Sequence, residues 1–180
     1  MATATVSSSP QERAGAVTFK GNPLTLIGPE IKVGAKAPEF QTVSQDLSPV
    51  TLSSVKGNTL LISVVPSLDT PVCDAQTRRL NEEAAKLPNV QILTVSMDLP
   101  FAQKRWCGAA GIDKVKVVSD HKDASFGKAY GMLIKELRLL TRAIVLVDGA
   151  GIVRYVEYVP EVTSHPNYDA ALAAVRSLGK

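Results

Sequence analysis

The spacing of hydrophobic residues changes along this 180-residue chain, and the changes predict alternating strands and helices. Short apolar runs at residues 60–65 and 90–95 are typical of buried strands. Between them, residues 74–87 carry apolar side chains at helical spacing and predict a helix. A shorter helix is expected at residues 99–109, followed by a short strand at residues 115–118.

The two ends of the chain complete the predicted architecture. Residues 17–20 and 24–27 favour a hairpin, and residues 142–147 and 152–159 favour an antiparallel pair. Further strands are expected near residues 40–43 and 50–52, and further helices at residues 124–130 and 169–178. This order predicts an α/β fold with a mixed central sheet flanked by helices.

The chain shows neither a repeat nor a linker, so residues 17–180 are expected to form one domain. Hydrophobic residues make up 45% of the sequence, enough for a full core. Residues 1–16 are rich in Ser, Thr and Ala and predict a disordered N-terminal tail. The tail lacks the apolar core of a secretory signal. An organelle transit peptide is disfavoured because Arg13 is its only basic residue.

The charge pattern excludes several classes of partner. The formal charge is +3, from 20 basic and 17 acidic residues, and the basic residues are scattered. This pattern indicates neither a nucleic-acid interface nor a basic membrane-binding helix. The apolar runs fall well short of the roughly 20 residues that span a bilayer. We therefore expect a cytoplasmic protein.

The chain contains two cysteines, Cys73 and Cys107. They are too few for a secreted disulfide scaffold and do not form the Cys-x-x-Cys pair of a thioredoxin-type dithiol. Zinc is disfavoured because His121 and His165 lie far from both cysteines and lack ligand spacing. A cytosolic redox site is the natural interpretation.

The segment Pro66-Ser-Leu-Asp-Thr-Pro-Val-Cys73 joins a predicted strand to a predicted helix. Thr70 suits the N-cap and Pro71 suits the first helical position, which places Cys73 in the first turn. There the free backbone N–H groups and the helix dipole favour a thiolate. The alternative is a small buried hydrophobic residue, which is the commoner role of a lone cysteine. The tight Thr-Pro turn favours a nucleophile.

At these residues the chain resembles the peroxiredoxins, in which a Pro and a Thr precede the reactive Cys as Pro66 and Thr70 precede Cys73. Longer stretches of the sequence resemble one subgroup of that family, the thiol peroxidases. The matching stretches are Ser67-Leu-Asp-Thr-Pro-Val-Cys-Asp74, Met97-Asp-Leu-Pro-Phe-Ala-Gln-Lys-Arg-Trp-Cys107, Arg142-Ala-Ile-Val-Leu-Val-Asp148 and Pro166-Asn-Tyr-Asp169. The resemblance runs from about Val17 to the C-terminus and implies a thioredoxin-like fold with an added N-terminal hairpin.

The resemblance also implies a function, the thiol-dependent reduction of hydrogen peroxide and organic hydroperoxides. Cys73 would be the peroxidatic residue and would become a sulfenic acid. Cys107, 34 residues later, would be the resolving residue of an atypical intramolecular disulfide. Thioredoxin would recycle the enzyme without an organic cofactor or metal, and a homodimer is expected. The family usually has Phe at the position of Trp106, an aromatic-for-aromatic change.

Three further residues have expected roles at the site. Thr70 would cap the helix and contact the sulfur or the peroxide. Arg142 begins a strand, where position alone predicts a solvated side chain, but the resemblance implies an active-site arginine that holds thiolate and peroxide together. Pro66 would shield the sulfur from water, or would only end its strand.

Asp74 would oppose a thiolate beside it, so its carboxylate is expected to point to solvent, offset by Arg78 and Arg79. The two cysteines lie on different predicted helices, so the reduced protein is expected to hold them too far apart to bond. Disulfide formation would then require local unwinding around Cys73, around Cys107 or around both, and residues 98–111 are the better candidate.

Two other functions use the same cysteines, a redox-switched binding or chaperone module and a thiol-dependent reductase of another substrate such as arsenate. The combination of Pro66, Thr70, Cys73 and Arg142 favours a peroxidase, because a switch needs only the two thiols. Peroxide consumption by the reduced protein separates the peroxidase from both alternatives.

Overall fold

The computed structural model describes residues 9–55, 57–87 and 89–179. The strands are β1 (Glu12–Phe19), β2 (Asn22–Ile27), β3 (Gln41–Val43), β4 (Pro49–Thr51), β5 (Thr59–Val64), β6 (Val90–Ser96), β7 (Lys116–Ser119), β8 (Leu133–Ile134), β9 (Leu139–Leu140), β10 (Ala143–Val147) and β11 (Val153–Tyr158). The helices are α1 (Leu52–Val55), α2 (Pro71–Ala84), α3 (Pro100–Ala110), α4 (Ser125–Ala129) and α5 (Tyr168–Leu178).

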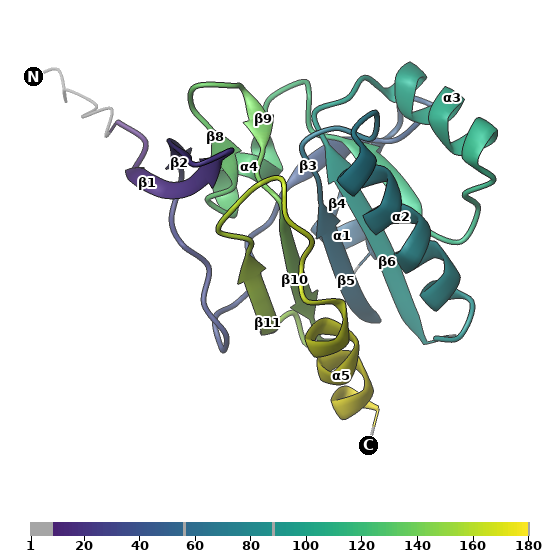
Figure 1. The fold of residues 1–180 in the computed structure, drawn as a ribbon. Coiled ribbons are helices and arrows are strands. Elements are labelled where there is room, and N and C mark those ends of the chain that lie inside the picture. The colour runs from purple at the N-terminus through teal and green to yellow at the C-terminus, as the bar shows by residue number, and fades with distance from the viewer. Residues whose placement is uncertain (1–8, 56, 88, 180) are drawn as a thin grey trace, which may run out of the picture.

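A seven-stranded mixed sheet forms the centre of the molecule (Figure 1), in the order β11-β10-β5-β6-β7-β3-β4. The β5, β6 and β7 strands are parallel, and the flanking pairs are antiparallel. Parallel strands are normally covered on both faces, which explains the unbroken apolar runs of β5 and β6. The predicted α/β fold with a mixed sheet is confirmed.

Alternate residues of the central strands pack into two separate cores, as the two-residue period of a strand requires. Leu61 and Ile92 face the core under α2, α3 and α5, together with both cysteines. Leu60, Ile62 and Leu93 face the core under α1 and α4. Figure 1 shows α2 and α5 on the same face of the sheet. Helices therefore flank both faces, as predicted.

The N-terminal hairpin belongs to a second sheet, with the order β1-β2-β8-β9. Its turn is Lys20-Gly21, where φ is 50° and 81°, rather than the predicted residues 21–23. The β1 strand begins at Glu12, so the tail boundary expected at residue 16 was placed too late. The early residues of β1 are mostly exposed and give no alternating pattern, which explains the error. The expected tail at residues 1–8 lies outside the described residues.

Three short elements were not predicted, namely α1, β8 and β9, and α2 ends earlier than expected, at Ala84. Elements of two to four residues are too short for a periodic signal. In the parts of the chain that the structure describes, each helix is too short or too polar to cross a membrane.

Candidate active site

Cys73 lies in the first turn of α2, just beyond the C-terminal end of β5. Thr70 occupies the N-cap position with extended backbone angles, and Pro71 is the first helical residue. The Cys73 side chain is completely buried. The predicted register is therefore correct, and the sulfur lies near the positive end of the helix dipole.

Thr70 differs from its prediction in one respect. Within the described residues its side chain makes no capping hydrogen bond. The Thr70 hydroxyl instead donates to the Ser67 carbonyl at 2.9 Å, because the tight turn before the helix brings that carbonyl within reach. Its oxygen keeps the capacity to accept a hydrogen bond.

Arg142 immediately precedes β10 and is almost completely buried, with 2% of its surface exposed. The solvated side chain expected from its position alone is therefore wrong. Its Nη2 donates to the Cys73 sulfur at 3.2 Å, and its Nε donates to the Val162 carbonyl at 2.8 Å. These bonds fix the planar fork in place, and a positive charge at this distance stabilises a sulfur anion.

Gln76 is a site residue that sequence reasoning missed. It is completely buried, and its Oε1 accepts from Arg142 Nη1 at 2.9 Å. Its Nε2 donates to the Ser63 hydroxyl at 2.7 Å, which sets the orientation of the amide. The available signal was a polar residue one turn after Cys73 on the buried face of the helix.

The N-terminal hairpin braces the loop that supplies the Val162 carbonyl. Val162 N donates to the Thr18 carbonyl at 2.8 Å. The neighbouring Glu161 carboxylate accepts from the Thr18 hydroxyl at 2.6 Å and from Lys20 N at 2.9 Å. These hydrogen bonds, led by the one from Thr18, hold the pKa of Glu161 well below its usual range. The hairpin thereby supports an acceptor of Arg142.

A cavity of about 280 Å³ lies at the start of α2, between that helix and the hairpin, and it borders Val72 and Arg142 rather than Cys73 itself. The lining residues are Phe19, Lys20, Pro66, Thr70, Pro71, Val72, Arg142, Val162 and Thr163. The structure thus brings together three predicted residues, Pro66, Thr70 and Arg142, and Arg142 connects the cavity to the sulfur. Pro66 is buried, in keeping with a wall that excludes water.

Cys107 lies apart from this cavity, in the last turn of α3. Its sulfur accepts from Gln45 Nε2 at 3.4 Å and borders a separate cavity of about 420 Å³. Burial raises the pKa of the Cys107 thiol, and the Gln45 hydrogen bond only partly opposes this effect. Both cysteines, which lie within the described ranges, are free thiols with different partners.

The Asp74 side chain is about one-third exposed, in keeping with the expectation that its carboxylate points to solvent. It forms an ion pair with Arg78 at 2.8 Å. Arg79 does not take the expected part in this pairing. Its side chain points instead toward Glu83 and Asp169, at 3.9 Å and 3.7 Å.

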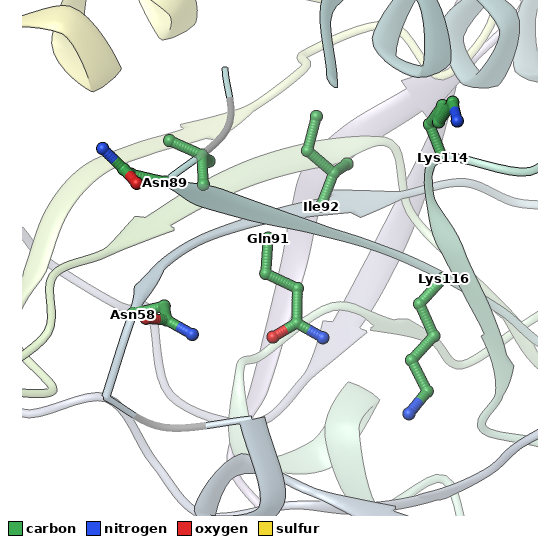
Figure 2. Close-up of a pocket in the computed structure, with 7 residues that line it drawn as sticks. Asn58, Asn89, Gln91, Ile92, Lys114 and Lys116 are labelled. Atoms are coloured by element: carbon green, nitrogen blue, oxygen red, sulfur yellow. The ribbon is translucent and has the colours of Figure 1, made fainter. Parts of the chain in front are cut away.

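Another cavity, of about 380 Å³, lies at the N-terminal ends of β5, β6 and β7, the ends that face away from Cys73 (Figure 2). Amide and lysine side chains line much of it, among them Gln91, Lys114 and Lys116. Parallel sheets usually bind ligands at the carboxyl ends of their strands. Cys73 follows the carboxyl end of β5, so the candidate active site is at the expected end.

The fold and site define a thiol-dependent oxidoreductase, with a buried cysteine where a strand meets a helix and an arginine on its sulfur. Comparisons with known proteins make the assignment narrower. The Redoxin family model matches residues 32–172. The thiol peroxidase of Halalkalibacterium halodurans is 61% identical over 161 residues, covering 89% of this chain and 97% of that protein. The thiol peroxidase of Bacillus subtilis is 57% identical, covering 91% and 98%.

A solved structure of a peroxiredoxin-like protein from Aquifex aeolicus is similar throughout, with a TM-score of 0.86 and 45% identity. The matched region covers 92% of this chain and 98% of the Aquifex aeolicus chain. The chain therefore belongs to the Redoxin family and, within it, to the thiol peroxidases of the peroxiredoxin group. The predicted family and thioredoxin-like fold are confirmed.

Proposed function

We propose that the protein reduces peroxides through Cys73. The observation that carries this proposal is the buried Arg142 guanidinium, which donates to the Cys73 sulfur at 3.2 Å. The thiolate attacks the terminal oxygen of a hydroperoxide, so an S–O bond forms as the O–O bond breaks. Cys73 becomes a sulfenic acid, and the leaving oxygen takes up a proton to give an alcohol or water.

The surrounding residues assist this displacement. Gln76 accepts a hydrogen bond from Nη1 of Arg142 and so keeps the guanidinium in one orientation. The positive charge is therefore already in place when the leaving oxygen becomes anionic. The Thr70 hydroxyl borders the cavity, and because it donates to the Ser67 carbonyl its oxygen is the acceptor for the bound peroxide. Pro66 forms a wall of the same cavity and limits water at the sulfur.

The second step forms the Cys73–Cys107 disulfide. The Cys107 thiolate attacks the sulfur of the sulfenic acid, and hydroxide leaves and is protonated to water. Because each sulfur has its own partner, Arg142 or Gln45, this step requires local movement. The dithiol of thioredoxin then reduces the disulfide and is itself oxidised.

The cavity also bears on the substrate and setting. Phe19, Val72 and Val162 give its wall apolar surface that suits an organic hydroperoxide as well as hydrogen peroxide. Recycling by a dithiol requires a reducing compartment, which supports the cytoplasm. A homodimer is proposed from the family alone.

A coupled assay with thioredoxin and its reductase tests the function, with hydrogen peroxide and an organic hydroperoxide side by side. The unsubstituted protein is expected to consume both peroxides continuously. Cys73→Ser should abolish consumption. Cys107→Ser should reduce one equivalent and then stop, since it cannot form the disulfide. A Cys73→Ser variant that still turns over would contradict the proposal.

A further inference from the structure

Asp98 lies between β6 and α3, and its carboxylate joins two segments that are distant in sequence. Oδ1 accepts from the Ser67 hydroxyl at 2.8 Å, and Oδ2 accepts from Leu68 N at 2.8 Å. Oδ2 also accepts from the Ser96 hydroxyl at 2.7 Å. Two of these three bonds therefore come from the turn that leads into α2.

That turn determines how α2 begins. The Ser67 carbonyl accepts from both the hydroxyl and the backbone N–H of Thr70, at 2.9 Å and 3.3 Å. The Thr70 carbonyl in turn accepts from Asp74 N at 2.9 Å, the first helical hydrogen bond around Cys73. Asp98 thus holds Ser67, and Ser67 holds Thr70 at the edge of the peroxide cavity.

The other side of Asp98 leads into the helix that carries Cys107. The Asp98 carbonyl accepts from the Ser119 hydroxyl, which fixes the chain at the end of β6. The next residue, Leu99, occupies the N-cap position of α3. A displacement of Asp98 would therefore change the position of the start of both helices that carry a cysteine, α2 and α3.

We propose that Asp98 is a positioning residue that latches the turn before α2 to the start of α3. The latch holds Cys73 and Thr70 ready for peroxide and keeps α3 in place. Its bonds to Ser67 and Leu68 break when Cys107 moves to form the disulfide. This inference rests on the proposed function, because it assigns a role in both of its steps.

The latch makes a distinctive prediction. Without the carboxylate, Thr70 and Cys73 are less well held, so attack on peroxide slows. Small misplacements of reacting groups can cost up to about a hundredfold in rate, and we expect roughly a tenfold loss here. At the same time α3 is released more easily, so the sulfenic acid condenses with Cys107 faster. A merely structural defect would not change the two rates in opposite directions.

Two separate measurements test this in Asp98→Ala. The attack step is isolated in a Cys107→Ser background by trapping the sulfenic acid with a dimedone-type probe. The resolution step is followed in the two-cysteine protein after one equivalent of hydrogen peroxide, as the rate constant for conversion of the sulfenic acid to the disulfide, by rapid acid quench and mass spectrometry of both species. Attack is expected to slow and disulfide formation to accelerate.

Matched variants keep the test informative. Asp69→Ala removes an exposed carboxylate from the same turn and should leave both rates unchanged. Ser67→Ala removes the bond to Oδ1 together with the longer 3.3 Å bond from Asp69 N, and it leaves the bond from Leu68 N to Oδ2 in place. It should give a smaller effect in the same directions, even if Asp98→Ala folds poorly. Circular dichroism and thermal melting establish which variants are folded.

The proposal is wrong if the rates of peroxide attack and of disulfide formation are both unchanged in folded Asp98→Ala and Ser67→Ala. It is also wrong if the two rates fall together. Failure of the proposed function has a different signature. In that case the unsubstituted protein itself forms no Cys73–Cys107 disulfide after peroxide, whatever the residue at position 98.

Discussion

Nη2 of Arg142 lies 3.2 Å from the sulfur of Cys73, although the two residues are 69 positions apart in the sequence. The sheet creates this contact, because β10, which follows Arg142, pairs with β5, which precedes the Cys73 turn. Burial makes the contact consequential, since a guanidinium removed from water needs every available partner. The sulfur therefore lies in a fixed electrostatic setting before any peroxide arrives.

Arg142→Lys should retain a positive charge but lose the planar fork that bonds Cys73, Gln76 and Val162 together. Removing one preorganised donor typically costs about 3–4 kcal/mol of transition-state stabilisation. We expect sulfenic acid formation to slow by about a hundredfold or more in single-turnover measurements. Unchanged kinetics in a folded Arg142→Lys protein would show that charge alone suffices.

Gln76→Leu should slow the same step while preserving side-chain volume. The substitution leaves Arg142 Nη1 and the Ser63 hydroxyl buried without their amide partner. Each unpaired buried group costs about 1–3 kcal/mol, so the free energy of unfolding should also fall. Ser63→Ala in the Gln76→Leu background removes one unpaired group. It should recover part of the stability but not the rate, because Arg142 remains unsupported.

The sequence was sufficient to predict the central sheet, the helix register at Cys73 and the family. These depend on local patterns, namely an apolar run, a Thr-Pro helix start and short ordered motifs. The resemblance implied an active-site role for Arg142, but its position at a strand entrance did not predict its burial, and no local pattern predicted the role of Gln76. Both depend on which strands become neighbours. Thr70 shows the remaining gap, since a residue typical of an N-cap makes no capping bond and instead donates its hydroxyl hydrogen to the Ser67 carbonyl.

Asp120 should make stability depend on pH. It is buried, and desolvation raises its pKa to about 6, although Gly127 N and Phe126 N donate to its carboxylate. The folded state thus binds a proton more tightly than the unfolded state, whose pKa is near 3.8. The stability contributed by the protonated form is fully present below about pH 4 and is lost as pH rises through about 6.

A shift of this size corresponds to about 3 kcal/mol between those limits. Denaturant unfolding of the unsubstituted protein and Asp120→Asn at several values from pH 4 to pH 8 checks the effect. The uncharged amide has no carboxyl to titrate, so the stability difference between the two proteins should change across this range in favour of Asp120→Asn. A difference that is constant with pH would show that Asp120 does not titrate there.

The last prediction concerns α3 during the catalytic cycle. Cys107 must leave Gln45 to reach Cys73, and α3 has few buried anchors, namely Pro100, Gln103 and Cys107 itself. The β5 strand, by contrast, is buried along nearly its whole length. Local opening of a weakly anchored segment costs far less free energy than global unfolding. We therefore expect residues 98–111 to lose hydrogen-exchange protection on oxidation, while β5 and β6 keep theirs.

Hydrogen exchange with mass spectrometry on the reduced and peroxide-oxidised protein measures this directly. Cys107→Ser treated with the same peroxide is the matched control, because it can form the sulfenic acid but not the disulfide. Its α3 should remain protected, which would assign the opening to disulfide formation rather than to oxidation of Cys73. Equal protection of α2 and α3 in both states, with the disulfide demonstrably formed, would mean that the two sulfurs meet without unwinding either helix.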